Sequence, residues 1–264
     1  MKKVLVVLLI VSLLFTLCAC SVPHNSFMSK SMVNSLVKAY PNPQAKVTFT
    51  YDTGGNNFEV TITYNLLLDK APLAVTRFIQ IANEGGYDGT LVDALSKSAP
   101  MYAVMGRYTH QNEYYAVRTT DVTFAGEFAS NGYREPKGGY AEFKLYSLAM
   151  FHKNEGEYFD SADGTFILAL AGAGKTLSSA NYAVFAEFAS MTVKTNGETT
   201  TKETTSPSAK LRDHLLSFST TSRTIYDSVD KDAPSFSAPI CSTEVKLTVE
   251  IVEGYDWSKL PTIR

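Results

Sequence analysis

The residues from Ala169 to Thr176 form the string in this sequence that most directly suggests chemistry. They read Ala-Leu-Ala-Gly-Ala-Gly-Lys-Thr, a loose form of the glycine-rich phosphate-binding loop, and they follow an apolar run. In such a loop backbone N–H groups surround a phosphate, while the lysine and the hydroxyl reach the nucleotide and its metal ion. The motif requires a helix after the loop and alternating strands and helices around it. The segment from Leu177 to Phe188 looks like a loop and a strand instead, which argues against a nucleotide site.

Histidines and carboxylates form no recognisable centre. The four histidines are scattered through the chain: His24, His110, His152 and His214. They lack metal-ligand spacing, so the sequence predicts no metal and places them on the surface or in loops. Glu84, Asp88 and Asp93 are close in sequence, which in a loop usually indicates a solvated face. A Gly-x-Ser-x-Gly elbow is missing from the sequence, so a hydrolase has no support.

The first twenty residues predict where this protein works. Lys2 and Lys3 precede an apolar run from Val4 to Leu17, which is shorter than the roughly 20 residues of a membrane span. A charged start, an apolar middle and a small-residue exit are typical of a secretory signal peptide, here residues 1–19. The mature chain is therefore expected outside the cytoplasm. Nucleotide is scarce there, which counts further against the loop at Ala169.

The end of this leader, Leu17-Cys-Ala-Cys20, resembles the signal of a bacterial lipoprotein. The resemblance implies that Cys20 becomes the acylated first residue of the mature chain and anchors it to the outer face of the membrane. An ordinary signal peptide and an uncleaved anchor remain open as alternatives. All three predict an extracytoplasmic protein.

Composition indicates a folded domain after the leader. Of the 264 residues, 45% are hydrophobic and 19% are charged, which is enough for one sizeable core. The formal net charge is −2, and removal of Lys2 and Lys3 makes it about −4, so no nucleic-acid partner is expected. Cys18 would leave with the leader and Cys20 would carry lipid. Cys241 is then left without a disulfide partner.

Hydrophobic periodicity predicts the elements that would position a site. Residues 20–43 are polar and turn-rich around one short amphipathic stretch, Met32 to Tyr40, and are expected to be a tether for a domain of residues 44–264. Alternating apolar and polar side chains predict a hairpin from Lys46 to Tyr64. A helical period predicts a helix from about Pro72 to Glu84.

The rest of the chain is also dominated by predicted strands. Apolar or β-rich runs occur at Tyr102–Met105, Thr165–Ala171, Tyr182–Phe188 and Val245–Ile251. The threonine-rich residues 195–210 have almost nothing to bury and are predicted to be a disordered insertion. A second helix is expected from Leu211 to about Phe218. The fold class is therefore mainly β.

Several short strings follow one another along the chain in a characteristic order. The most specific are Asp69-Lys-Ala-Pro and Tyr87-Asp-Gly-Thr. They are followed by Glu127-Phe, Ser147-Leu-Ala-Met and Ser161-Ala-Asp-Gly-Thr-Phe. An ordered series with compatible strand and helix periods is unlikely to arise by chance. Over roughly residues 46–251 the series resembles the cyclophilin-type peptidyl-prolyl cis-trans isomerase family, which implies a closed eight-stranded antiparallel barrel capped by the two predicted helices.

The family rotates the peptide bond before proline, whose barrier of about 18–20 kcal/mol comes from partial double-bond character. The resemblance implies an apolar proline pocket and an arginine that stabilises the twisted bond, with no cofactor. The arginine position falls on Ala94 and the glutamine position on Met105. Because alanine has no side-chain donor, isomerase activity is expected to be weak or lost. Arg107 is a candidate substitute, since it shares the strand face of Met105; a rim arginine in solvent is the alternative.

The remaining site positions predict an apolar groove that binds extended peptide. Its expected lining is Tyr102, Ala103, Met105, Met150, Phe151, Thr165, Ile167, Leu177 and Tyr182. Barrel core is the alternative for these residues, for Ile167 in particular. The sequence thus predicts a lipid-anchored folding helper whose partners are proline-containing segments of exported proteins. A non-catalytic peptide-binding or scaffold module on the cell surface is the alternative function.

Overall fold

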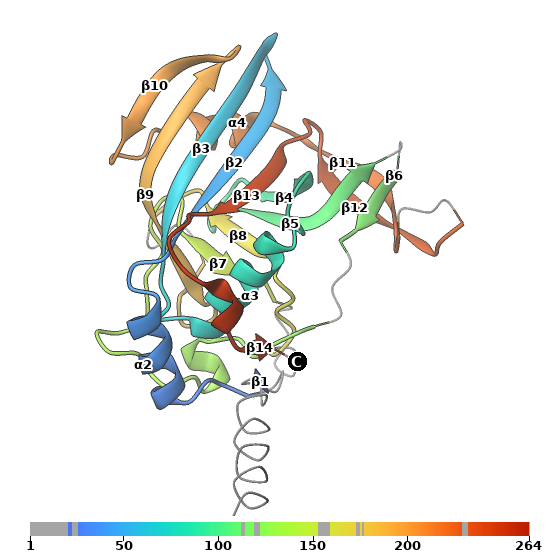
Figure 1. The fold of residues 1–264 in the computed structure, drawn as a ribbon. Coiled ribbons are helices and arrows are strands. Elements are labelled where there is room, and N and C mark those ends of the chain that lie inside the picture. The colour runs from blue at the N-terminus through green and yellow to red at the C-terminus, as the bar shows by residue number, and fades with distance from the viewer. Residues whose placement is uncertain are drawn as a thin grey trace, which may run out of the picture.

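Eight antiparallel strands close into a barrel (Figure 1). The computed structural model describes residues 21–22, 26–111, 114–118, 122–152, 159–172, 175, 177–228 and 232–263. The barrel strands are β2 (Gln44–Thr53), β3 (Asn56–Leu66), β4 (Thr90–Ser96), β5 (Tyr102–Gln111), β7 (Leu148–Met150), β8 (Phe166–Ala169), β9 (Val184–Thr195) and β13 (Lys246–Ile251). Around the ring the order is β5, β4, β13, β2, β3, β9, β7 and β8, and β8 pairs with β5 to close it. The predicted fold class is confirmed.

Strands β2 and β3 show why these residues form a barrel wall. Val47, Phe49 and Tyr51 are buried, while the intervening threonines are partly or fully exposed. In the register, Phe49 lies opposite Val60, which is also fully buried. Alternation with a period of two therefore gives the hairpin one inner and one outer face. The inner face belongs to the large apolar cluster inside the barrel, called here the main core.

Both predicted helices form and pack against the main core. Helix α3 (Pro72–Asn83) begins with a proline, whose fixed φ suits the first helical turn. Its Phe78 ring lies 5.6 Å from Phe166 and 5.0 Å from Phe185, measured between ring centroids. Helix α4 (Lys210–Ser217) buries Leu211 and Leu215 in the same core.

The segment predicted to be a tether is folded onto the barrel from residue 26 onward, which corrects that prediction. Helix α2 (Lys30–Ala39) buries Leu36 in the main core, and Tyr40 follows it there. The Tyr40 ring stacks at 4.8 Å on Trp257, which opens the short 3-10 helix η3 (Trp257–Lys259). Enough apolar side chains occur in this polar stretch to dock it. Further toward the N-terminus, β1 (Ser21–Val22) pairs in parallel with β14 (Thr262–Ile263).

Residues 195–210, predicted to be disordered, instead include a strand. Strand β10 (Glu198–Thr204) pairs with the extended end of β9. Asn196 and Gly197 join them with φ values of 52° and 81°, and Asn-Gly is the dipeptide that favours such a hairpin turn. Backbone pairing orders the segment without burying its side chains. The prediction from composition was therefore wrong here.

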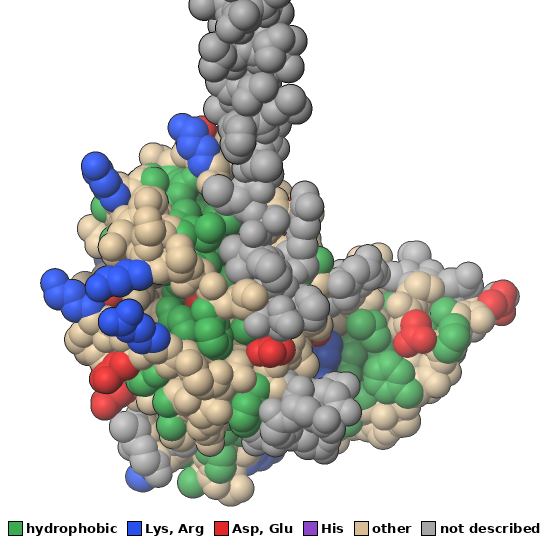
Figure 2. All heavy atoms as spheres, turned by 90° about the horizontal axis from the view of Figure 1, so that it is seen from below, with side chains coloured by type: hydrophobic (Ala, Val, Ile, Leu, Met, Phe, Trp, Pro, Cys, Tyr) green, Lys and Arg blue, Asp and Glu red, His purple; other side chains and the backbone are tan. Residues whose placement is uncertain are grey.

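Three further strands extend the sheet away from the barrel and are called here the wing. They are β6 (Tyr114–Val117), β11 (Thr220–Tyr226) and β12 (Ser235–Cys241). The short 3-10 helix η1 (Ala129–Asn131) lies between β6 and β7 in the chain and is not part of the wing. A small apolar cluster joins the wing to β4 and β5, the wing cluster: Leu91, Tyr108, Ile225, Ala238 and Ile240. Figure 2 shows the wing projecting from the body with hydrophobic side chains on the face in view.

The predicted signal peptide and Cys20 lie outside the described residues. Among the helices that the structure does describe, none is both long enough and apolar enough to cross a membrane.

Candidate functional site

Two apolar clusters lie on opposite faces of β5, β7 and β8. One is the main core inside the barrel, and the other, called here the outer-face cluster, lies outside it. The buried members of the outer-face cluster are Val104, Phe143, Ala149, Ile167, Ala169, Tyr182 and Val184. Partly exposed residues packed against it are Leu67, Ala94, Tyr102, Ala141, Phe151 and Leu177. One strand supplies both clusters, because side chains alternate along it.

The outer-face cluster contains the predicted groove residues Tyr102, Phe151, Ile167, Leu177 and Tyr182. Ile167 is fully buried in it and Tyr182 is 6% exposed. Tyr102, Phe151 and Leu177 keep part of their surface accessible. Of the predicted groove residues in this cluster, these three are therefore the ones that solvent reaches.

Three predicted groove residues lie in the main core instead. Ala103 and Met105 are 0% exposed and Met150 is 1% exposed. Met105 lies opposite Phe166 in the β5–β8 register, and both side chains point into the barrel. Their placement in the groove is therefore corrected, because the period of two puts them on the inner face. Thr165 is 1% exposed and belongs to neither cluster.

Ala94 stands where the family resemblance expects the arginine. It packs, partly exposed, against the outer-face cluster, whereas Val92 packs in the main core. Residues two apart on a regular strand would share a face. The β4–β5 register is irregular between Val92 and Leu95, and this irregularity turns Ala94 outward. Position 94 therefore faces outward but carries no side-chain donor.

Asp93, next to Ala94, forms a buried ion pair with Arg107. Both Nε and Nη2 of Arg107 lie 2.8 Å from Oδ2 of Asp93. The Asp93 side chain is fully buried, while 30% of the Arg107 side chain is exposed. Burial raises the pKa of Asp93 to about 6, and Arg107 opposes the shift by favouring the charged carboxylate. Asp93 is thus a buried carboxylate paired with an arginine, whereas the sequence predicted a solvated loop carboxylate.

Arg107 lies at the edge of the outer-face cluster, but the backbone geometry that orients it differs from the prediction. It does not share the face of Met105, because Gly106 between them has a φ of 82° and interrupts the alternation. The Arg107 guanidinium carbon lies 5.7 Å from the centroid of the Phe151 ring and 4.5 Å from that of Tyr108. A Cβ at Gly106 would come within 3.1 Å of Phe166. Only glycine fits this turn comfortably.

His152 lies in a loop, as one of the two predicted alternatives had it, but it is buried and not on the surface. It is 2% exposed, and its ring lies 4.7 Å from those of Phe128 and Tyr182. Nε2 donates to the backbone carbonyl of Asn181 at 2.7 Å. The imidazole therefore packs against the Tyr182 ring and is itself held by the hydrogen bond to Asn181. The sequence offered one signal for a position near the site, since His152 directly follows the predicted groove residue Phe151.

Glu127 is a second buried carboxylate that sequence reasoning did not assign. Helix α3 has no side-chain cap of its own, and Glu127 accepts hydrogen bonds from the N–H groups of Leu73 and Ala74 at 2.9 and 3.0 Å. Burial raises its pKa to about 8, and the two N–H donors oppose the shift. Glu127 thus holds the N-terminus of the helix that packs into the main core.

The candidate phosphate-binding loop lacks its helix in the part of the chain that the structure describes. Ala169 ends β8, and the described residues from there to β9 contain only turns and bends. Within the described ranges, no group of three or more His, Cys, Asp or Glu side chains could hold a metal ion. Ala173, Gly174 and Thr176 of the motif lie outside these ranges.

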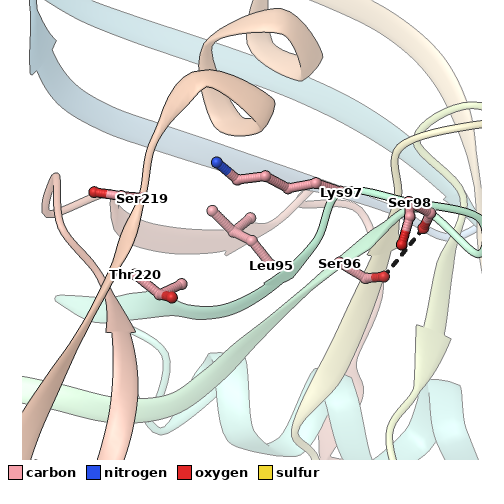
Figure 3. Close-up of a pocket in the computed structure, with 6 residues that line it drawn as sticks. All are labelled: Leu95, Ser96, Lys97, Ser98, Ser219 and Thr220. Atoms are coloured by element: carbon pink, nitrogen blue, oxygen red, sulfur yellow. Dashed lines mark hydrogen bonds between the residues drawn. The ribbon is translucent and has the colours of Figure 1, made fainter.

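A cavity of about 680 Å³ lies between the end of β4 and the start of β11 (Figure 3). It is lined by Leu95, Ser96, Lys97, Ser98, Ser219 and Thr220. Lys97 extends over Leu95 toward the segment that carries Ser219. Cys241 pairs with Thr220 and is buried, and burial raises the pKa of its thiol to about 11. A thiol with a raised pKa holds little thiolate near neutral pH, and the thiolate is the nucleophilic form.

Comparison with known proteins places residues 48–212 within one family model, described as cyclophilin type peptidyl-prolyl cis-trans isomerase/CLD. No curated protein matches the sequence. A cyclophilin-type isomerase from Cryptosporidium parvum is 11% identical, with 81% of this chain and 99% of that chain covered and a TM-score of 0.44. The cyclophilin of Mimivirus is 14% identical, with 81% and 92% covered and a TM-score of 0.41.

Proposed function

Because the chain belongs to the cyclophilin-type peptidyl-prolyl cis-trans isomerase family, we propose that it binds proline-containing segments of exported proteins and isomerises them weakly or not at all. The observation that carries this proposal is Ala94, an outward-facing alanine where the family pattern has its arginine. The surface around it is apolar, with Tyr102, Phe151 and Leu177 partly accessible. Such a surface suits an extended peptide rather than a charged ligand.

The expected catalytic deficit follows from the missing donor. One preorganised donor is typically worth about 10²–10³ in rate, and alanine offers none. The purified full chain should therefore isomerise a proline-containing peptide at close to the uncatalysed rate. A rate far above that would contradict the proposal.

Restoring the arginine gives the sharper test. Ala94→Arg should accelerate isomerisation by roughly tenfold or more, because the position is on the outer face and needs no core rearrangement. Ala141→Arg is the matched control, since Ala141 is another partly exposed alanine of the same cluster. Equal activity in both variants would show that position 94 has no special relation to the substrate.

The second candidate function is a non-catalytic peptide-binding or scaffold module. It is favoured by the Asp93–Arg107 pair, because Arg107, the candidate substitute for the family arginine, already has a buried counter-ion. Saturable peptide binding with no isomerisation, even in Ala94→Arg, would select this alternative.

The location is part of the proposal and rests on the leader and on Cys20. Cells that express the protein and receive labelled fatty acid should yield a labelled, membrane-associated chain. Cys20→Ser should remove both the label and the membrane association. A labelled Cys20→Ser variant, or an unlabelled wild type, would contradict lipid anchoring at this residue.

A further inference from the structure

Arg107 lies where the two apolar clusters outside the barrel meet. Its guanidinium approaches the ring of Phe151, which packs against the outer-face cluster, and the ring of Tyr108, which belongs to the wing cluster. A guanidinium held over aromatic faces is stabilised by cation–π attraction. The two rings and the Asp93 carboxylate together restrict where the side chain can move.

The pairing with Asp93 leaves part of the guanidinium free. Nε and Nη2 both donate to the same oxygen, Oδ2. Among the described residues, Nη1 of Arg107 has no hydrogen-bond acceptor, and 30% of the side chain is exposed. Arginine has five N–H donors in a rigid fork. An edge with oriented donors therefore remains available beside Phe151.

The charge of the pair selects the kind of acceptor that fits this edge. With Asp93 ionised, the pair has no net charge, so a ligand carboxylate gains little from it. A neutral acceptor such as a main-chain carbonyl can still receive a hydrogen bond from the cationic donor, and hydrogen bonds of this type are among the stronger ones in proteins.

We propose that the free edge of Arg107 donates a hydrogen bond to a main-chain carbonyl of the bound peptide, whose neighbouring apolar side chain rests on Phe151. Arg107 is then a binding residue specific to this chain, and Asp93 is the residue that positions it. The inference rests on the proposed peptide-binding function. It adds that the peptide path runs along the seam between the barrel and the wing.

The test measures binding of a fluorescein-labelled, amidated Ala-Ala-Pro-Phe-Ala peptide to the full chain in detergent, by fluorescence anisotropy. The single variant Arg107→Ala would strand a buried carboxylate and is prone to unfold. The informative variant is therefore Asp93→Asn/Arg107→Met, which removes the pair as a unit. We expect its affinity to fall about tenfold or more, the usual loss for a hydrogen bond from a charged group.

Arg223→Met is the matched control, because Arg223 also lies over a tyrosine ring, that of Tyr115, at 5.6 Å, but on the wing. Its affinity should equal that of the wild type. No saturable binding to the wild type would overturn the proposed function itself. Wild-type binding that the double variant retains in full, in protein that melts cooperatively, would overturn the role of Arg107 alone.

Two further variants separate positioning from mere stability. Arg107→Lys keeps a charge next to Asp93 but loses the fork, so it should recover only part of the affinity. Asp93→Asn should weaken binding in the wild-type background and have no further effect once Arg107 is replaced. Equal effects of Asp93→Asn in both backgrounds would contradict a positioning role. A second peptide with Asp before the proline should bind no more tightly than the first.

Discussion

The inner and outer faces of β5, β7 and β8 differ in how completely their side chains are buried. On the inner face, Met105 and Phe166 lie opposite each other in the β5–β8 register and are fully buried in the main core, to which helix α3 also contributes. On the outer face of the same strands, Ala94 and Phe151 remain partly exposed. The main core is therefore built without the partly exposed apolar residues that would contact a peptide. A side chain at position 94 contributes nothing to the inner packing, because Ala94 faces outward.

The buried carboxylates Glu127 and Asp93 also belong to different faces of the barrel wall, Glu127 to the inner packing and Asp93 to the outer side. Glu127 caps α3, which belongs to the inner packing, and Asp93 holds Arg107 on the outer side. Both are raised in pKa by burial. One supports the scaffold and the other supports the candidate site, so they can be tested separately.

The largest expected effect is on the pH dependence of stability. Asp93 and Glu127 titrate ordinarily at 3.8 and 4.5 but at about 6 and about 8 in the folded chain. The folded state therefore holds these protons more tightly, and their contribution to the free energy of unfolding falls as pH rises from 3.8 to about 8. At about 1.4 kcal/mol per pKa unit, Asp93 alone accounts for about 3 kcal/mol.

Urea unfolding across this pH range measures the effect. Glu127→Gln and Asp93→Asn should each flatten the curve over its own part of the range, whereas Glu187→Gln, at a partly exposed glutamate, should leave it unchanged. A curve that rises with pH in the wild type and is unaffected by either variant would show that these two groups are not buried as carboxylates.

Met105→Ala should cost about 2–5 kcal/mol in the free energy of unfolding, because it leaves a cavity in the main core. Chemical denaturation measures this cost. Peptide affinity of the folded fraction should be unchanged, since Met105 is 0% exposed. A variant of normal stability that loses peptide binding would instead place Met105 in the groove and break the distinction between the two faces.

Gly106→Ala should cost about 1–3 kcal/mol, the usual range for forcing a non-glycine residue into a left-handed conformation. Gly106 separates inward-facing Met105 from outward-facing Arg107, so the strain should also reduce peptide affinity. Gly132→Ala is the control, because Gly132 has a φ of 74° but a Cβ there would meet nothing within 4 Å. Equal loss of affinity in both variants would show that Gly106 does not orient Arg107 specifically.

Leu177→Ala should change the free energy of unfolding least, by less than about 1 kcal/mol, because its side chain is only partly buried. Peptide affinity should nevertheless fall several-fold if Leu177 contacts the ligand. Binding and melting measurements on the same preparation compare the two effects. Unchanged affinity would restrict the peptide surface to Tyr102 and Phe151.

Much of the scaffold could be predicted from the sequence because its signals are local. Alternation predicted the β2–β3 hairpin, and the helical period together with Pro72 predicted α3 within one residue at its C-terminal end. Composition was less reliable. It missed β10, which is ordered by backbone pairing with β9, and it missed the docking of α2 through Leu36.

The candidate site was harder to predict, because it depends on which way each side chain points. A strict period of two would put Ala94 with Val92 and Arg107 with Met105. The register irregularity in β4 and the positive φ of Gly106 reverse both placements. Such irregularities arise from the pairing of strands, and a single strand read alone does not contain them.

The sequence by itself determined the apolar periodicity that makes the barrel, and it determined that position 94 carries no donor, since both are properties of residue type and spacing. Only the tertiary structure decided that Asp93 and Arg107 form a buried pair. They are fourteen positions apart, and the pairing of β4 with β5 brings them together. Burial excludes water from Asp93, so the carboxylate requires the arginine beside it. That contact holds Arg107 at the seam between barrel and wing.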